Sequence, residues 1–480
     1  MPRGRISRFF RRIRRADPVP QHQLGAGPIQ RLPPDILELI FLALVGSDAH
    51  RLTGSDRMQR TLRIGHVCHR WRVVLYDYPA MWSTIDIASA KPHTLSILQH
   101  FIKNSASHPL RIIACLQISG PTSSSIRRDC ILDELLAHLS RWETVFLTIN
   151  WVVYEPLYQI APGSLEQLTS ITFSAPGWRK EHVQAFWTNV CHKKNRNLRY
   201  VSWQVDFLNH PPTFAPWDRL AHVKFGSFAS LSEVMKILPL CGSLEVLSIK
   251  ELRKNPTGAV LPPIDGKITL EKLQALEIRP SDGTDISPLF DRLSVPRLVK
   301  LDATFTPPPY IAYQHYAFPF NSLFEMLVRS QCHLQTLRIG TLWVVVHESQ
   351  VLRYLKNPFA QTVTDLTLAF WTTDAIVEAL ASLPRLTHLV CKRACPTDGV
   401  LARALRSLLG GTNLGFVGES ASNCLHIEMP LDPLKHLDDC AVIAEAQGLG
   451  LLLFSDTRPK PVNIQTLGKK AGTKLLLGTL

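Results

Sequence analysis

The chain has 480 residues, a formal net charge of +14, 45 % hydrophobic residues and 19 % charged residues. An apolar fraction this high excludes disorder throughout, and the length predicts two or three domains or one elongated array. The sequence contains no uninterrupted run of 18 apolar residues, so we expect no membrane-spanning helix. The 10 cysteines include no C-x-x-C pair and no secretory signal is present, which favours a reduced protein in the cytoplasm, the nucleus or both.

Residues 1–28 are expected to form a basic, disordered tail and linker. Half of the positive excess lies in the first fifteen residues, where seven arginines precede the first acid, Asp17. Apolar residues at helical spacing separate these arginines, so the segment could form a basic amphipathic helix on an anionic membrane or partner. A nuclear-import signal, an organellar presequence and a solvated tail are the alternatives.

Residues 29–82 are predicted to form small helices. Pro34 opens a first amphipathic helix, with apolar residues at positions 36, 37, 40, 41 and 44. Residues 46–61 have no apolar period and carry Gly, Ser and Asp, so we expect a solvated loop. The helical period restarts at Ile64 and ends before Pro79. These helices have more apolar surface than they can bury alone, which predicts a partner.

Three short motifs follow one another in this region: Leu32-Pro33, then Val-Cys-His-Arg-Trp at 67–71, then Met81-Trp82. In this order they resemble the F-box, the module that ties substrate receptors to the adaptor subunit of SCF-type cullin-RING ubiquitin ligases. The resemblance implies that Trp82 joins the module to the next domain. It assigns adaptor contact to Leu32, Pro33, Ile36, Leu37, Ile40, Val67, Cys68 and Trp71. The alternative is a helical hairpin that caps a repeat array and uses these residues as its core.

The remainder of the chain is self-similar. An L-x-x-L-x-L template, loosened to any apolar residue, recurs ten times at intervals of 22 to 36 residues. Segments with helical periodicity separate most copies, so strands and helices should alternate and the strands should be parallel. The copies begin at Trp142, Leu168, Leu198, Leu220, Leu244, Leu273, Leu298, Leu334, Val363 and Leu386.

A period of 20 to 30 residues with this template resembles leucine-rich repeats of the degenerate kind that often accompany F-boxes. The Asn or Cys that regular repeats carry after the template is missing, so curvature and regularity stay open. We predict an α/β fold: a small all-α F-box at 29–82, then a leucine-rich-repeat-like α/β solenoid with parallel strands at 83–456. Residues 457–480 are expected to form a loose C-terminal tail.

The template also sorts side chains between the two faces of each strand. If positions 4 and 6 point into the solenoid, positions 3, 5 and 7 point to its open concave face. These positions hold six Lys or Arg residues and three acidic residues. This excess of positive charge favours a protein substrate of acidic or phosphorylated character. The alternative is an ordinary solvated face. The predicted substrate-binding residues are Tyr200, His222, Lys224, Lys250, Arg279, Lys300, Arg338 and Lys392.

Candidate catalytic and metal-binding residues are scarce. His66, Cys68 and His69 lie close together, but a zinc site needs four ligands and no second pair follows. Cys191, Cys241 and Cys332 each precede a template copy, which indicates a small buried residue at one structural position. We therefore predict no catalytic residue, no metal and no cofactor.

The predicted function is that of a non-enzymatic SCF substrate receptor, which binds the adaptor, and through it the cullin, with the F-box and a protein substrate with the solenoid. The alternative is a ligase-independent leucine-rich-repeat scaffold, tethered to nucleic acid or membrane by the Arg-rich N-terminus. Nucleic acid is the less favoured partner.

Overall fold

The structure is a computed structural model. It describes residues 32–45, 56–116, 122–149, 153–203, 215–253, 266–280, 284–304, 319–340, 347–394, 396–411, 425–431, 435–448 and 452–456. The predicted tails at 1–28 and 457–480 lie outside these residues, as does the first part of the predicted loop at 46–61.

The chain divides into two compact units, Met1–Glu143 (unit 1) and Thr144–Leu480 (unit 2). The predicted boundary between residues 82 and 83 falls inside unit 1. Fourteen strands of the described residues belong to one long parallel sheet, with β1 and β2 in unit 1. The protein is therefore a mixed α/β structure, compatible with a solenoid-like fold.

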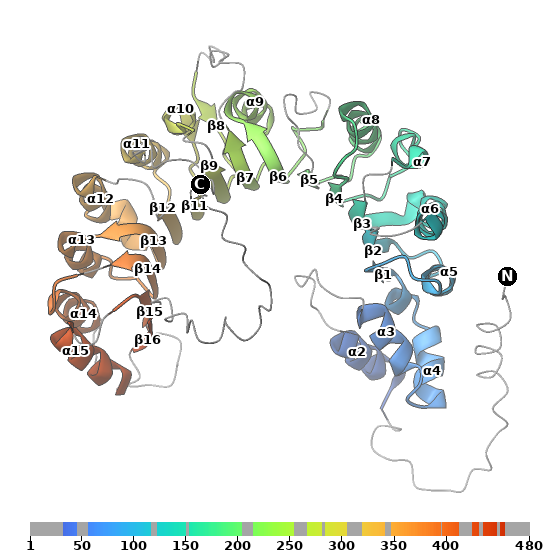
Figure 1. The fold of residues 1–480 in the computed structure, drawn as a ribbon, viewed down its shortest axis with the longest axis horizontal. Coiled ribbons are helices and arrows are strands. Elements are labelled where there is room, and N and C mark those ends of the chain that lie inside the picture. The colour runs from blue at the N-terminus through green and yellow to red at the C-terminus, as the bar shows by residue number, and fades with distance from the viewer. Residues whose placement is uncertain are drawn as a thin grey trace, which may run out of the picture. The chain divides into compact units, whose positions relative to one another are not determined.

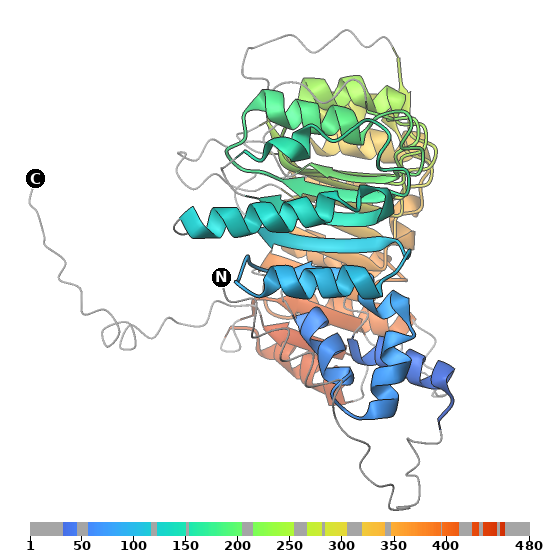
Figure 2. The ribbon, with the colours of Figure 1, turned by 90° about the vertical axis from the view of Figure 1, so that its right-hand side faces the viewer.

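Unit 1 begins with three short helices that pack closely together, labelled α2, α3 and α4 in Figure 1 and drawn in blue in Figure 2. The strands β1 (Thr84–Ile87) and β2 (Leu110–Leu116) pair in parallel, with Ile85 opposite Ile112. The helices of unit 1 are α2 (Pro34–Val45), α3 (Asp56–Ile64), α4 (His69–Tyr76), η2 (Pro79–Trp82), α5 (Thr94–Asn104), α6 (Thr122–Leu136) and η3 (Leu139–Arg141).

Helix α3 corrects the prediction of a loop over residues 46–61, because residues 56–61 are helical. Only Met58, Thr61 and Ile64 turn inward, and all three are buried. Their spacing of three residues places them on one side of the helix, while the rest of α3 is mostly polar. The composition of α3 is strongly polar, which is why residues 56–61 resemble a loop in the sequence.

The prediction of one continuous second helix from Ile64 to Tyr78 was also wrong. A turn at residues 65–67 divides it, and α4 begins only at His69. Cys68 forms the N-cap of α4: its Sγ accepts a hydrogen bond from the backbone N–H of Trp71 at 3.4 Å. A thiol is not one of the usual capping groups, so the sequence does not predict that a helix begins at His69.

Two tryptophans occupy equivalent positions in unit 1. The Nε1–H of Trp82 donates to the carbonyl of Leu75 at 2.9 Å, and that of Trp142 donates to the carbonyl of Leu135 at 3.1 Å. Each tryptophan is buried, lies seven residues after its acceptor, and enters or precedes a strand. Trp82 thus opens a further copy of the repeat template, completed by Ile85 and Ile87, which the sequence analysis missed.

Unit 2 alternates strands and helices, and the helices lie on one side of the sheet (Figure 1). Neighbouring strands pair in parallel, for example Leu247 of β7 with Leu276 of β9. β3 starts at the end of unit 1, and β8 and β10 form a separate parallel pair. The strands are β3 (Trp142–Ile149), β4 (Ser170–Ser174), β5 (Tyr200–Trp203), β6 (His222–Ser230), β7 (Val246–Arg253), β8 (Ile268–Thr269), β9 (Ala275–Pro280), β10 (Leu293–Ser294), β11 (Lys300–Thr304), β12 (Thr336–Gly340), β13 (Asp365–Thr372), β14 (His388–Ala394), β15 (Leu425–Met429) and β16 (Leu452–Asp456).

The helices of unit 2 lie between successive strands, as the helical periodicity of the segments between template copies predicted. Figure 1 shows them on one side of the sheet. The other side, where template positions 3, 5 and 7 of each strand lie, carries no helix among the described residues, and we call it the helix-free face of unit 2. The helices are α7 (Glu155–Tyr158), α8 (Lys180–Val190), α9 (Leu231–Ile237), η4 (Leu238–Leu240), α10 (Ser287–Arg292), α11 (Phe320–Ser330), α12 (Glu348–Leu355), η5 (Pro358–Thr362), α13 (Asp374–Ala379), η6 (Leu380–Ser382), α14 (Val400–Gly411) and α15 (Leu437–Gly448).

The core of unit 2 lies between the sheet and its helices. Template positions 4 and 6 point into it, as predicted: Leu247 and Ile249 of β7 are fully buried, like their counterparts on the other strands. The recurring cysteines at 191, 241 and 332 are buried too, so the predicted small apolar position is confirmed. Burial raises the pKa of the thiols of Cys191 and Cys241 to about 12.

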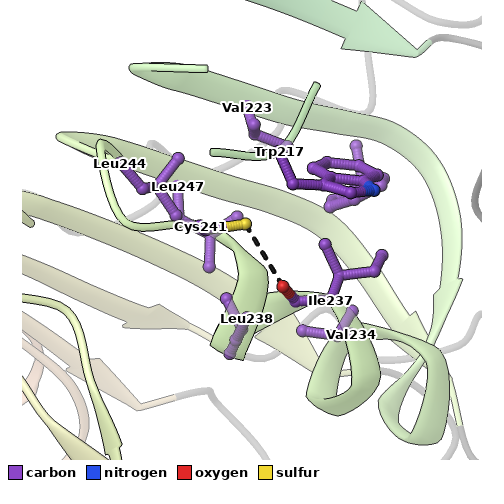
Figure 3. A pocket seen from close by; sticks show the side chains of 9 residues that line it. Trp217, Val223, Val234, Ile237, Leu238, Cys241, Leu244 and Leu247 are labelled. Atoms are coloured by element: carbon purple, nitrogen blue, oxygen red, sulfur yellow. Dashed lines mark hydrogen bonds between the residues drawn. The ribbon is translucent and has the colours of Figure 1, made fainter. Parts of the chain in front are cut away.

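One small cavity lies beside helix α9, lined by apolar residues of α9, η4, β6 and β7 (Figure 3). Its volume is about 10 Å³, which is room for about one water molecule at most. Cys241 lies at its edge, and its thiol donates to the carbonyl of Ile237 at 3.4 Å. A cavity so small and apolar is a packing defect and holds no ligand.

Candidate functional site

Helix α2 of unit 1 exposes apolar side chains to solvent. Ile36, Leu39 and Ile40 recur at steps of three and four residues, so they share one side of the helix. Leu39 is 62 % exposed, and Val67, in the turn before α4, is 59 % exposed. Large apolar side chains exposed within one short segment are typical of surfaces that contact a protein, a membrane or a ligand.

The predicted adaptor residues divide between this surface and the core. Leu37 is fully buried and packs inside the helices, whereas Pro33, Ile36 and Val67 are exposed. Half-buried positions make up the rest of the set: Leu32, Ile40, Cys68 and Trp71. Leu39 was missed by the sequence analysis, although its spacing from Ile36 could have identified it.

Two contacts hold α2 against α4. The guanidinium of Arg70 donates to the carbonyl of Leu32, and the rings of Phe41 and Trp71 lie 5.0 Å apart. Leu32 therefore contributes its backbone to the structure as well as its side chain to the motif. These contacts fix the apolar side of α2 relative to the turn that carries Val67.

Trp82 holds α4 to the strand and helix that follow. Its ring lies 5.0 Å from that of Tyr76 on α4 and 5.0 Å from that of Phe101 on α5. With its hydrogen bond to Leu75, this buried side chain contacts both elements. Trp82, to which the resemblance assigns a joining role, thus packs between α4 and α5 inside unit 1.

The predicted substrate residues all lie on strands of unit 2, on the side of positions 3, 5 and 7. Lys250, Lys300 and Lys392 are exposed. The other five are half-buried: Tyr200, His222, Lys224, Arg279 and Arg338. The parallel register brings several of them together, because Lys224 lies opposite Ser248, and Ser248 lies opposite Glu277.

A basic cluster forms where strands β6, β7 and β9 pair. It consists of Lys224, Lys250 and Arg279 around Glu277. Arg279 binds Glu277 at 2.7 Å, and the hydroxyl of Ser248 donates to the same carboxylate at 2.8 Å. Burial lowers the pKa of Lys250, and the charges of Lys224 and Arg279 lower it further. Burial would raise the pKa of Glu277, but the Ser248 hydrogen bond and the nearby cations hold it below its usual value.

The remaining predicted residues are dispersed. Arg338 pairs with Asp365 at 3.5 Å, and His222 lies 3.8 Å from Glu245. Lys300 and Lys392 lie on β11 and β14, strands that two others separate. The sequence thus placed these residues on the correct side, but only those around Glu277 form a compact charged group.

A cluster near the C-terminal end of unit 2 was not predicted. Asp398, His436 and Asp439 offer ligand atoms within 4.8 Å of one another, a spacing that could hold a metal ion. Both carboxylates already accept backbone N–H groups, however. Asp439 receives those of Gly399 (3.1 Å) and Ala402 (2.8 Å), and Asp398 receives that of Asp439 (3.2 Å). The two aspartates thus cap the first turns of α14 and α15 reciprocally, which is a structural role.

Comparisons with known proteins leave the site to be interpreted from its own geometry. No protein-family model matches the chain, and no curated protein matches it. Among solved structures, the crystal structure of a protein from Bacteroides fragilis matches with a TM-score of 0.31 and 16 % identity, over 64 % of this chain and 74 % of that chain. Within the described ranges, no helix has both the length and the apolar character that crossing a bilayer requires.

Proposed function

We propose that the chain is a substrate receptor of an SCF-type cullin-RING ubiquitin ligase. In this proposal the helices of residues 32–82 bind the adaptor subunit, and the helix-free face of unit 2 binds the protein to be ubiquitinated. The receptor catalyses nothing itself, because its contribution is to hold lysines of the bound protein near a charged ubiquitin carrier.

The apolar side of α2 is the observation that carries the proposal. Ile36, Leu39 and Ile40 lie on it, and Val67 is exposed in the turn before α4. These residues coincide with the part of the chain whose Leu-Pro and Val-Cys-His-Arg-Trp motifs resemble the F-box. Burial of exposed leucine and valine side chains against a partner is favourable by about 25 cal/mol per Å².

Co-purification of the adaptor with the full chain tests the proposal. We expect wild type to retain the adaptor and the double variant Leu39→Arg, Val67→Arg to lose it, since both charges would be buried in the interface. Both positions are exposed in the free chain, so the variant should still fold.

A matched control uses two similarly exposed leucines of unit 2. Leu240 is 54 % exposed and Leu453 is 59 % exposed. Leu240→Arg with Leu453→Arg adds the same charge and should leave adaptor binding unchanged. Absence of the adaptor from the wild-type purification would contradict the proposal and favour a ligase-independent scaffold.

A further inference from the structure

The basic cluster contains two lysines whose charges are only partly compensated. Arg279 forms an ion pair with Glu277 at 2.7 Å, whereas Lys224 and Lys250 form no ion pair within 4.0 Å among the described residues, although the charge of Glu277 acts on both. Three positive charges thus lie around Glu277, and Asp302, which lies opposite Glu277 on the neighbouring strand β11, is the second carboxylate, so an excess of one positive charge remains. The two lysines, which we call the lysine pair, lie on neighbouring strands of the helix-free face and supply the excess.

The spacing of the lysine pair follows from the register of the sheet. Lys224 of β6 lies opposite Ser248 of β7, and Lys250 is two residues further along β7. With a strand separation of about 4.8 Å and a rise of about 3.3 Å per residue, the two Cα atoms are about 8 Å apart. An extended peptide presents side chains on one side every two residues, which is about 7 Å. Two acidic side chains at positions i and i+2 therefore match the two lysines one to one.

The chemistry of the cations also indicates whether the ligand carries carboxylates or a phosphate. Arg is the residue that binds phosphate in a bidentate fork, and the guanidinium of Arg279 is already engaged by Glu277 at 2.7 Å. Lysines act as separate point charges on flexible stems. Two separate ammonium groups fit two monovalent carboxylates better than one phosphate.

We propose that the lysine pair binds an extended segment of the partner protein that carries two acidic side chains two residues apart. This inference rests on the proposed function, in which the helix-free face holds a protein. It narrows the substrate class from acidic or phosphorylated segments in general to those with an acid-x-acid pattern.

Fluorescence anisotropy of the full chain with three labelled peptides tests the inference. The first peptide, Gly-Ser-Glu-Ser-Glu-Ser-Gly, has the proposed spacing, and the second, Gly-Ser-Ser-Glu-Glu-Ser-Gly, has adjacent acids. The third, Gly-Ser-Gln-phosphoserine-Gln-Ser-Gly, carries one phosphate. We expect the first peptide to bind best, with an affinity that falls as salt rises, because the lysines are partly exposed.

Charge reversal of the lysine pair supplies the decisive comparison. Lys224→Glu with Lys250→Glu should weaken binding of the first peptide by about tenfold or more. The matched control reverses Lys272 and Lys356, two exposed lysines of unit 2 that lie outside the strands, and should change binding little. Equal effects of the two double variants would overturn the inference, as would equal or tighter binding of either comparison peptide.

Adaptor co-purification by the same variants separates this inference from the proposed function. Both charge-reversed variants should retain the adaptor, because their substitutions lie in unit 2. Loss of acid-x-acid selectivity with the adaptor retained would refute only the present inference. Peptide binding without any adaptor would refute only the ligase role.

Discussion

Trp82 offers the sharpest test of how the proposed adaptor-binding helices are held in place. Its side chain is buried, its ring packs against Tyr76 and Phe101, and its Nε1–H donates to the carbonyl of Leu75 at 2.9 Å. Trp82→Ala removes all of these contacts and should cost about 3–5 kcal/mol of local stability. Trp82→Phe keeps most of the ring packing and loses the hydrogen bond, so it should cost about 1–2 kcal/mol.

Hydrogen exchange of the full chain measures these costs locally, from the protection of the amides of α4 and α5. Trp371→Ala is the matched control, because that tryptophan is 60 % exposed and its loss should cost less than about 1 kcal/mol. The reasoning fails if Trp82→Ala lowers the free energy of opening of α4 and α5 by no more than Trp371→Ala does.

Three further predictions concern unit 2. Asp439→Ala leaves two backbone N–H groups at the start of α14 without their acceptor and should lower the free energy of unfolding by about 2–4 kcal/mol in urea denaturation, whereas Asp439→Asn should cost less. Burial would raise the pKa of Asp398, but backbone hydrogen bonds at the start of α15 hold it below its usual value. The stability that Asp398 contributes is therefore present above about pH 4 and lost as pH falls through the folded-state pKa, so the difference between wild type and Asp398→Asn should shrink on acidification. Burial raises the thiol pKa of Cys191 and Cys241 to about 12, so at pH 8 the native chain should react with a thiol reagent at exposed Cys130 and not at these two.

The sheet of unit 2 could be predicted because its signal is local and repeated. Each template copy places an apolar pair two residues apart, as at Leu247 and Ile249, and parallel pairing of such copies follows from the alternation with helices. The recurrence of cysteine before three copies likewise predicted a buried position. The small pair of strands β8 and β10, each only two residues long, gave no such signal.

The features that sequence reasoning missed depend on distant partners or on narrow apolar faces. Helix α3 turns only three side chains inward, so its composition resembles that of a loop. The reciprocal caps of Asp398 and Asp439 join residues about 40 positions apart, a pairing that no local pattern encodes. The template copy at Trp82 overlaps the F-box-like motif, which the same residue completes.

The candidate surfaces could be predicted in part. Alternation within each strand placed Lys224, Lys250 and Arg279 on the helix-free face correctly. It did not reveal that Glu277 neutralises Arg279, because that depends on the conformation of the two side chains. In unit 1 the motif included Leu37, which the structure buries, and omitted Leu39, which it exposes.

Direct binding of the purified chain to the purified SCF adaptor, measured by calorimetry, tests the central claim most directly. We predict a one-to-one complex with a negative heat-capacity change, because the apolar side of α2 would be buried on binding. The Leu39→Arg, Val67→Arg variant should not bind, and the Leu240→Arg, Leu453→Arg control should bind like wild type. No detectable complex with wild type, or equal affinity for both variants, would contradict the account.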